Sequence, residues 1–581
     1  MKSFFCILFA LSALNSIAQT VDINKADIKF ITGDNLNFAN PAYEDTNWKN
    51  IKLGANWETQ GYEGYDGYAW YRIKIIIPSA LKAAAIENKG LVMNLGAIDD
   101  ADISYFNGKQ IGSTGGFPPE YYSAWNTNRH YRIHEEQVLW DKINVIAVRV
   151  YDLHQGGGMY LGPHTIAPAD WKDNISAKIA CTNPSFIFKE GQPATFSVTL
   201  NNLTGKKFSG TLKTVYSTDQ HEEYGAATQP FFLEAGEQKT LNLSKQFSLP
   251  GFYEAGFQLK KNGDTATASF SSIFGYAIEQ IKVNPDPQKD FYSYWQETRK
   301  ELNNTNPEYK TTLSNKWSTS TLDVYLVELK SLGQVKIRGW YSVPKGQKHL
   351  PGLLRIPGHS VNILPDTTIK DFAVLALNIR GHGNSVEDVH PGFPGFVVHG
   401  LQNKYTYVYR GAYMDGIRGL DFLCSRPEVD TSRIAVEGHS QGGGISIAIA
   451  ALDHRIKAIA PDQPFLSNFR TYFKIASWPK SEFQSFANTT FKGSMDSVYT
   501  ILSYIDIKNL APMVKCPVIM LVGLKDQTCP PEINFAAFNN MASKNKEYRI
   551  YPEAIHELPS GYYKSKMNWI RRLFKMPETV N

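Results

Sequence analysis

The pentapeptide Gly438-His-Ser-Gln-Gly442 constrains the fold more than any other feature, because a strand pattern precedes it and a helix pattern follows. Residues 433–436 (Arg-Ile-Ala-Val) are typical of a buried strand, and residues 445–452 are rich in Ala and Ile, as in a helix. The turn between them needs glycine on both sides of the serine, since a β-carbon there would clash. The helix N-terminus adds a partial positive charge. This context predicts that Ser440 is a nucleophile.

Residues 281–581 have the pattern of an α/β domain. The runs 352–356, 372–379 and 517–523 are almost continuously apolar, as in strands of a parallel sheet that helices cover on both faces. A linker at 283–288 and an expected helix precede these strands. We therefore expect the pentapeptide to lie within an α/β domain of about 300 residues.

An acid and then a histidine should follow such a serine along the chain. Asp526 comes 86 residues after Ser440, on the loop that leaves the expected strand 517–523. His556 comes another 30 residues later, after a strand expected at 547–551. Taken singly, Asp526 could be a solvated loop residue and His556 a surface histidine, but their joint placement favours the triad of an α/β-hydrolase. His556 would be the general base, and Asp526 would orient its ring.

When such a serine attacks a carbonyl carbon, the carbonyl oxygen becomes negatively charged, and two N–H groups should stabilise that charge. One is expected to be the backbone N–H of Gln441, directly after the nucleophile. The other is expected from the loop after an early strand, where the segment 356–359 (Ile-Pro-Gly-His) favours the N–H of His359. The His359 side chain could instead contact the substrate, and His439 is expected to pack rather than to act. This chemistry needs no metal or cofactor, and we predict neither.

Residues 19–170 consist of short β-type runs separated by turns, with no long helical period between them. In one run Ile146, Val148 and Val150 share a face, and Asn107-Gly108 suits a two-residue hairpin turn. We therefore expect a β-sandwich.

Parts of this region resemble the galactose-binding-like jelly roll, the sugar-binding domain of β-galactosidase-type enzymes and of some sialate acetylesterases. The segments that carry the resemblance are 65–72, 95–102, 106–108 and 111–112. The resemblance implies either a sugar-binding domain or a spacer. Four aromatic residues and one glycine-rich loop could contact sugar, with core packing as the alternative for each tryptophan: Trp57, Tyr65, Trp70, Trp125 and residues 156–158.

Residues 171–280 continue the β pattern. Phe196, Val198 and Leu200 alternate with threonine and serine, as in a half-buried strand, and turn signals recur between such runs. About a hundred residues of this kind indicate an immunoglobulin-like sandwich, and its sequence shows no catalytic motif.

The first residues belong to targeting rather than to the fold. A positive start, an apolar run at 4–14 and small residues before Gln19 predict a signal peptide over residues 1–18. No later run reaches transmembrane length, so we expect no membrane anchor and an extracytoplasmic protein, periplasmic or secreted. Among the 581 residues, 60 Lys and Arg against 55 Asp and Glu form no like-charge block, which argues against a nucleic-acid partner.

Several motifs between residues 285 and 575 resemble, in order, the acetyl xylan esterase and cephalosporin-C deacetylase family of carbohydrate esterases. The matching segments are 407–418, 426–430, 438–443, Asp526 with 529–531, and His556-Glu557. One motif departs, since the family usually has Arg-Gly-Gln where this chain has Arg380-Gly-His382. Simpler members often form hexamers, an assembly that the added β-domains could block, so the oligomeric state stays open.

The site and the resemblance together imply a secreted serine carbohydrate esterase. It would remove O-acetyl groups from acetylated oligo- or polysaccharides of the xylan type through an acyl-enzyme. A serine peptidase of the prolyl oligopeptidase type shares the triad order, but the N-terminal region lacks the repeats of a propeller. A non-catalytic glycan-binding protein is the other alternative, although all three triad positions are filled.

Overall fold

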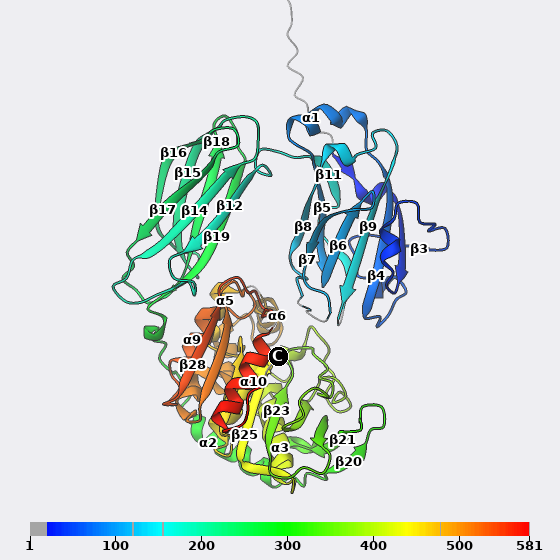
Figure 1. Cartoon of the computed structure of the whole chain (residues 1–581). Coiled ribbons are helices and arrows are strands. Elements are labelled where there is room, and N and C mark those ends of the chain that lie inside the picture. The colour runs from blue at the N-terminus through cyan, green and yellow to red at the C-terminus, as the bar shows by residue number, and fades with distance from the viewer. Residues whose placement is uncertain are drawn as a thin grey trace, which may run out of the picture.

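A computed structural model describes the chain at residues 20–118, 121, 123–153, 156–476, 478–559 and 561–579. The predicted signal peptide, residues 1–18, and Gln19 lie outside the described residues. The described chain forms three domains. Two sheet-rich domains lie side by side, and an α/β domain lies below both of them (Figure 1).

The first domain consists of two antiparallel sheets that share one hydrophobic core. One sheet has the order β1-β11-β5-β10 with β8 beside β5, and the other has the order β3-β2-β4-β9-β6-β7. Ile146, Val148 and Val150 of β9 are fully buried in this core, which confirms that they share a face. Asn107 and Gly108 both have positive φ, 48° and 81°, and join β6 to β7 as the predicted two-residue turn.

The elements of this domain are β1 (Val21–Asp22), β2 (Asp27–Thr32), β3 (Lys49–Asn50), β4 (Gly67–Ile76), α1 (Lys82–Glu87), β5 (Leu91–Asp99), β6 (Ala101–Phe106), β7 (Lys109–Thr114), β8 (Asn128–Ile133), β9 (Ile143–Asp152), β10 (Gly158–Leu161) and β11 (Thr165–Pro168).

The second domain pairs a three-stranded sheet, β12-β14-β17, with a five-stranded sheet, β13-β19-β18-β15-β16. In β14 the side chains of Phe196, Val198 and Leu200 are buried and the residues between them are half-exposed, as predicted. The strands are β12 (Ile175–Cys181), β13 (Ile187–Phe188), β14 (Ala194–Asn202), β15 (Phe208–Thr218), β16 (Glu223–Leu233), β17 (Gln238–Lys245), β18 (Gly251–Lys261) and β19 (Thr267–Tyr276).

The third domain is built on one nine-stranded sheet of order β20-β21-β22-β24-β23-β25-β26-β27-β28. From β24 to β28 neighbouring strands are parallel, so their carboxyl ends meet at one edge. Side chains on the two faces enter different clusters, since Leu354 packs with residues of α3 and α4 whereas Leu353 packs with Trp569 of α10. Helices thus cover both faces, as the apolar strands require.

The strands of this domain are β20 (Lys310–Leu313), β21 (Leu322–Lys330), β22 (Lys336–Pro344), β23 (Leu350–Ile356), β24 (Ala373–Asn378), β25 (Val429–His439), β26 (Ala458–Asp462), β27 (Val518–Gly523) and β28 (Lys546–Tyr551). The helices are α2 (Phe291–Asn303), α3 (Val408–Cys424), α4 (Gln441–Leu452), α5 (Phe469–Ile475), α6 (Lys480–Thr490), α7 (Met495–Ile505), α8 (Ile507–Leu510), α9 (Pro531–Phe538) and α10 (Tyr562–Leu573).

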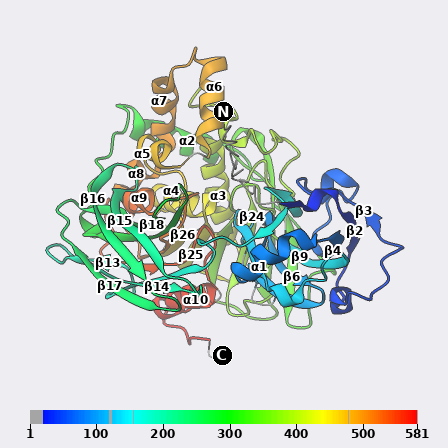
Figure 2. The same ribbon diagram turned by 90° about the horizontal axis from the view of Figure 1, so that it is seen from above.

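Seen from above, the two β-domains lie on opposite sides of the centre of the third domain (Figure 2). The second domain packs Phe252 of β18 against Phe535 of α9, with ring centroids 5.5 Å apart. Asn539 donates hydrogen bonds to the carbonyl oxygens of Ile278 and Ile281, which lie just after β19 in the segment that joins the two domains. These buried contacts tie the second domain to the edge of the large sheet.

Within the described part of the chain, no helix is both long and apolar enough to cross a membrane. The four cysteines of this part are free thiols: Cys181, Cys424, Cys516 and Cys529.

Candidate active site

Ser440 occupies the turn between β25 and α4. Its φ of 57° and ψ of −115° lie in a region that residues other than glycine rarely adopt. A β-carbon on Gly438 would lie 2.5 Å from the carbonyl carbon of Gly442, and a β-carbon on Gly442 would lie 2.2 Å from the carbonyl oxygen of Ile356. The turn therefore admits no side chain on these two glycines, and it is pressed against the end of β23.

Asp526 and His556 lie on the loops after β27 and β28, and their side chains are hydrogen-bonded. His556 Nδ1 is 2.8 Å from Asp526 Oδ2, while the N–H groups of Thr528 and Cys529 donate to the other carboxylate oxygen, each at 2.8 Å. Burial disfavours the charged imidazolium, but the Asp526 carboxylate outweighs it, so the pKa of His556 is raised. The pair can therefore accept a proton on Nε2 while Nδ1–H stays bonded to Asp526.

Cys529 connects this pair to the nucleophile turn. Its Sγ lies 3.8 Å from Ser440 Oγ, and its own N–H donates to Asp526. Burial raises the pKa of the Cys529 thiol well above its usual range, so the thiol stays protonated and does not compete as a nucleophile. Ser440, Asp526 and His556 thus lie in one cluster at the carboxyl edge of the parallel strands.

Gln463 joins this cluster although the sequence analysis did not identify it. Its Nε2 donates to Asp526 Oδ2 at 2.7 Å and to the carbonyl oxygen of Ile555 at 2.6 Å, and its Oε1 lies 3.1 Å from His439 Nε2. The side chain is completely buried. Its position directly after β26, at the edge where the strand ends meet, is the signal that could have identified it.

His439 has a hydrogen-bonding role beyond the packing that we expected. Its Nε2 lies 2.8 Å from the carbonyl oxygen of His556 and also faces Gln463 Oε1, so Nε2 carries the proton and donates to both oxygens. Burial, and then the neighbouring His556, lower the pKa of His439 to about 4. A neutral His439 therefore holds the backbone carbonyl of His556.

Gln441 and His382 form a second buried network beside Ser440. Gln441 accepts from Tyr409 through Oε1 at 2.8 Å, and its Nε2 lies 3.0 Å from His382 Nε2. The N–H of Ser360 also points to this histidine nitrogen, at 3.3 Å. Burial lowers the pKa of His382 to about 3, so the ring is neutral and accepts both bonds. His382, the residue that departs from the family motif, thus fixes the side chain of Gln441.

Arg380, from the same motif, makes a buried pair with Asp415 of α3. Two guanidinium nitrogens donate to the two carboxylate oxygens at 2.9 and 2.8 Å, and one of them also donates to the carbonyl oxygen of Leu332. This fork geometry holds the loop after β24 against α3.

His359, the expected second donor to the oxyanion, follows β23 by three residues. Aromatic rings surround its side chain, with centroids at 4.8 Å for Phe393, 6.0 Å for Phe396 and 5.2 Å for Trp478. Burial lowers the pKa of His359 to about 4, so its ring is neutral. The loop that carries the His359 N–H is held in place by this apolar packing.

Most of the suggested sugar contacts in the first domain belong to its core. Trp57 and Trp70 are completely buried, and Gly157 lies so close to Trp57 that a β-carbon would come within 2.0 Å of the indole ring. Tyr65 donates to the carbonyl oxygen of Tyr68. Trp125 differs, because 42% of its surface is exposed.

One group of carboxylates among the described residues could hold a metal ion. The ligand oxygens of Asp99, Asp100 and Asp152 all lie within 4.8 Å of one another. Asp100 already accepts hydrogen bonds from the hydroxyl groups of Tyr121 and Ser123. These carboxylates lie in the first domain, apart from the cluster of Ser440, Asp526 and His556.

A model of the acetyl xylan esterase family (AXE1) matches residues 276–573, just over half of the chain. The chain belongs to the acetyl xylan esterase family. It is therefore a carboxylic ester hydrolase.

Known acetyl esterases are similar to about half of this chain. An acetyl esterase of Xylanibacter ruminicola, Axe7A, is 25% identical over 315 residues, which cover 52% of this chain and 71% of that protein. The structure of the acetyl xylan esterase from Paenibacillus sp. R4 is 34% identical in sequence. The match covers 51% of this chain and 98% of that one, with a TM-score of 0.48. Acetyl Xylan Esterase 1 from Thermoanaerobacterium sp. JW/SL YS485 is 29% identical with the same coverage and TM-score.

Proposed function

We propose that this chain is a serine carbohydrate esterase that removes O-acetyl groups from acetylated oligo- or polysaccharides of the xylan type. The observation that carries this proposal is the 2.8 Å bond between His556 and Asp526, beside a serine in a strained strand-to-helix turn. Membership of the acetyl xylan esterase family supports the acyl group and the class of substrate.

Ser440 attacks the carbonyl carbon of the acetyl ester, and His556 Nε2 takes the hydroxyl proton. The raised pKa of His556 favours this transfer, because Asp526 stabilises the imidazolium that forms. His556 then gives the proton to the leaving sugar hydroxyl, which departs and leaves acetyl-Ser440. Water repeats the sequence and releases acetate.

The negative oxygen of each tetrahedral intermediate is bound by the backbone N–H groups of Gln441 and His359. Each such donor contributes about 3 kcal/mol to transition-state stabilisation. The His382–Gln441 bond and the aromatic packing of His359 support this role, because they hold both loops before substrate arrives. Short acyl groups other than acetyl should react as well, since a pocket discriminates by only about 1–3 kcal/mol per methylene.

For the rest of the chain we propose the organisation expected from its sequence. Residues 1–18 direct export and are removed, which makes the enzyme periplasmic or secreted. Residues 19–170 form a galactose-binding-like jelly roll, residues 171–280 an immunoglobulin-like sandwich and residues 281–581 the esterase. The paired sheets of the first two domains support these assignments.

The test is acetate release from acetylated xylo-oligosaccharides, beside a peptide substrate, by wild type and two serine variants. Ser440→Ala should lose about 10⁴-fold or more in kcat, because the nucleophile is gone. Ser446→Ala is the matched control, since Ser446 is a buried serine of α4 whose hydroxyl bonds only its own helix, to the oxygen of Gly442. It should retain activity.

Three outcomes would contradict the proposal. Equal acetate release by wild type and Ser440→Ala would show that the nucleophile is wrong. Peptide cleavage without deacetylation would select a peptidase of the prolyl oligopeptidase type. Sugar binding with neither reaction would select a non-catalytic glycan-binding protein.

A further inference from the structure

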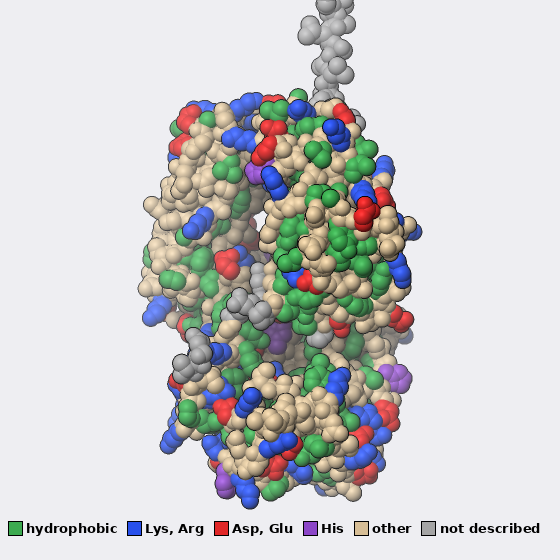
Figure 3. All heavy atoms as spheres, turned by 45° about the vertical axis from the view of Figure 1, so that its right-hand side comes forward, with side chains coloured by type: hydrophobic (Ala, Val, Ile, Leu, Met, Phe, Trp, Pro, Cys, Tyr) green, Lys and Arg blue, Asp and Glu red, His purple; other side chains and the backbone are tan. Residues whose placement is uncertain are grey.

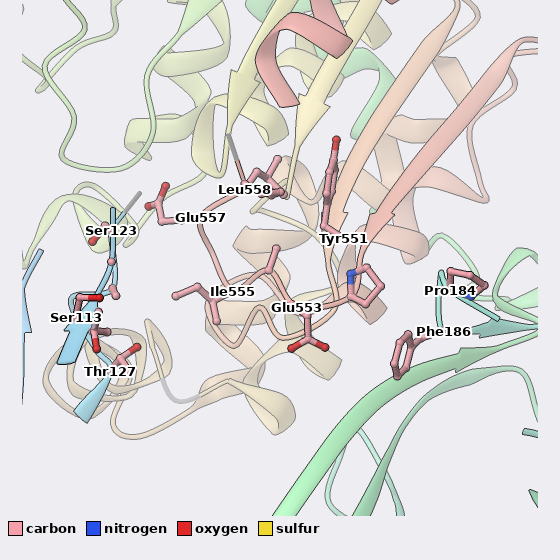
Figure 4. Close-up of a pocket in the computed structure, with 16 residues that line it drawn as sticks. Ser113, Ser123, Thr127, Pro184, Phe186, Tyr551, Glu553, Ile555, Glu557 and Leu558 are labelled. Atoms are coloured by element: carbon pink, nitrogen blue, oxygen red, sulfur yellow. The ribbon is translucent and has the colours of Figure 1, made fainter. Parts of the chain in front are cut away.

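A cavity of about 800 Å³ lies where all three domains meet. The first domain contributes residues near the end of β7 and from the loop before β8, among them Ser113 and Thr127, and the second contributes Phe186. The third contributes the loop after β28, including Ile555 and Glu557 (Figure 4). In the space-filling view the surface is hollowed along the line where the upper domains meet the lower one (Figure 3).

This cavity adjoins the proposed general base. Its lining residues Ile555 and Glu557 are the two chain neighbours of His556, and the charge of His556 acts on Glu557. The carbonyl oxygen of Ile555 is held by Gln463, which also holds Asp526. The cavity therefore lies next to the loop that carries His556.

The lining has the chemistry of a site for a neutral, hydroxyl-rich ligand. Exposed hydroxyl groups come from Ser113 and Thr127, and the charged groups among the described lining residues are two carboxylates, Glu553 and Glu557. Glu553 is paired with a lysine outside the lining, Lys525. Carboxylates and hydroxyls accept hydrogen bonds from sugar hydroxyls, whereas an anionic ligand would find no Lys or Arg among these lining residues.

Apolar surface completes the site. Phe186, Ile555 and Leu558 line the cavity, and Trp125, 42% exposed, belongs to the loop that supplies Ser123 and Thr127. A lining that combines apolar side chains with hydroxyl groups suits a pyranose ring, which has apolar faces and a polar rim. The volume lies within the range of about 300–1,000 Å³ that encloses a ligand of drug size, well above what an acetyl group needs.

We propose that this junction cavity binds the neutral sugar chain next to the acetylated residue, so that the two β-domains help select oligosaccharide over small esters. The inference rests on the proposed esterase function, because it places the chain on the leaving-group side of the site. Glu557 supports it further. Burial, and then nearby Asp100 and Asp526, raise the pKa of Glu557 to about 7 against the opposing effect of His556. It can therefore donate or accept near neutral pH.

The test places a large side chain in the cavity, on the side that the first domain contributes. Thr127 is exposed, so Thr127→Trp should fold, and Thr46→Trp places the same ring at an exposed threonine outside the lining. Thr127→Trp should lower kcat/KM on acetylated xylo-oligosaccharides at least about tenfold and leave p-nitrophenyl acetate within about twofold. Thr46→Trp should change neither. The proposal would be overturned if Thr127→Trp changed kcat/KM by the same factor for both substrates, whether both stayed at the wild-type value or both fell.

A binding measurement separates this proposal from the esterase mechanism. Calorimetry with xylotetraose on full-length Ser440→Ala should show binding that the added Thr127→Trp weakens at least about tenfold. The anionic trigalacturonate should bind more weakly than xylotetraose, and tighter binding of trigalacturonate would refute the charge argument. If wild type released no acetate but xylotetraose still bound in this way, the esterase proposal would fail while the cavity remained a sugar site. If xylotetraose did not bind, the cavity proposal would fail alone.

Discussion

Replacing Gln463 by leucine should separate the positioning of the triad from the stability of the fold. The amide faces two acceptors, Asp526 Oδ2 and the oxygen of Ile555, and one donor, His439 Nε2–H. Leucine has a similar volume but makes none of these bonds. Only the bond to Asp526 touches the triad directly, so its loss should appear in catalysis and the loss of the other two mainly in stability.

The magnitude follows from the kinds of bond. A hydrogen bond to a charged group contributes about 1.5–3 kcal/mol, and each neutral bond contributes about 1 kcal/mol. If the bond to Asp526 is needed to hold the His556 pair in its catalytic geometry, kcat should fall about tenfold to a hundredfold. With one donor gone, the Asp526 charge acts more strongly on His556. The acid limb of the pH–rate profile should therefore move to higher pH.

The assay is acetate release across pH, together with thermal unfolding. Asn509→Leu is the matched control: Asn509 is a buried amide of the same domain that donates to the oxygen of Ser503 and accepts from the N–H of Asp286. It should lower the melting temperature without changing kcat or the pH profile. The reasoning would be refuted if Gln463→Leu lost stability but kept both kcat and the acid limb, or if Asn509→Leu reproduced its kinetics.

Two further changes test the packing of the fold. Gly442→Ala should abolish most activity and destabilise the chain by about 1–3 kcal/mol, because its β-carbon would lie 2.2 Å from a strand carbonyl oxygen. Gly205→Ala should have neither effect, because a β-carbon at Gly205 meets nothing within 4 Å. Equal melting temperatures for the two variants would count against the close packing of the turn at Ser440. Burial raises the pKa of Asp219 to about 7, and burial with the Asp219 charge raises that of Glu532 to about 8. Folding therefore favours their protonated forms, and this contribution to stability should be lost as the pH rises from the ordinary values of 3.8 and 4.5 through the folded values of about 7 and 8. Calorimetry between pH 5 and 9 should show that loss in wild type and a smaller one in Glu532→Gln, and identical profiles would contradict it.

The local sequence pattern was enough to predict the strands and the turn that carries Ser440. The apolar run 517–523 predicts a buried strand, and β27 lies there with every residue buried. Gly438 and Gly442 predict a turn with no room for a β-carbon at these two positions, and in the structure an added β-carbon at either would clash with backbone atoms. The order serine, acid, histidine then restricts Asp526 and His556 to loops after later strands.

Gln463 and His382 could not be found in this way, because their roles depend on partners distant in the chain. Gln463 bonds residues 63 and 92 positions away, and His382 bonds Gln441 at a separation of 59. Hydrophobic periodicity reports whether a side chain is buried but not which other buried group it meets. The sheet order β25-β26-β27-β28 decides that, since it aligns the ends of strands that the sequence separates.

By itself, the sequence determined the nucleophile turn, the α/β character of residues 281–581 and the β character of what precedes them. It did so because steric limits at a turn and the burial of a strand act over a few residues. Only the tertiary structure decided which side chains hold Asp526 and that the loop of His556 faces two other domains across one cavity. Those contacts arise when separate surfaces dock, and no local pattern encodes the docking.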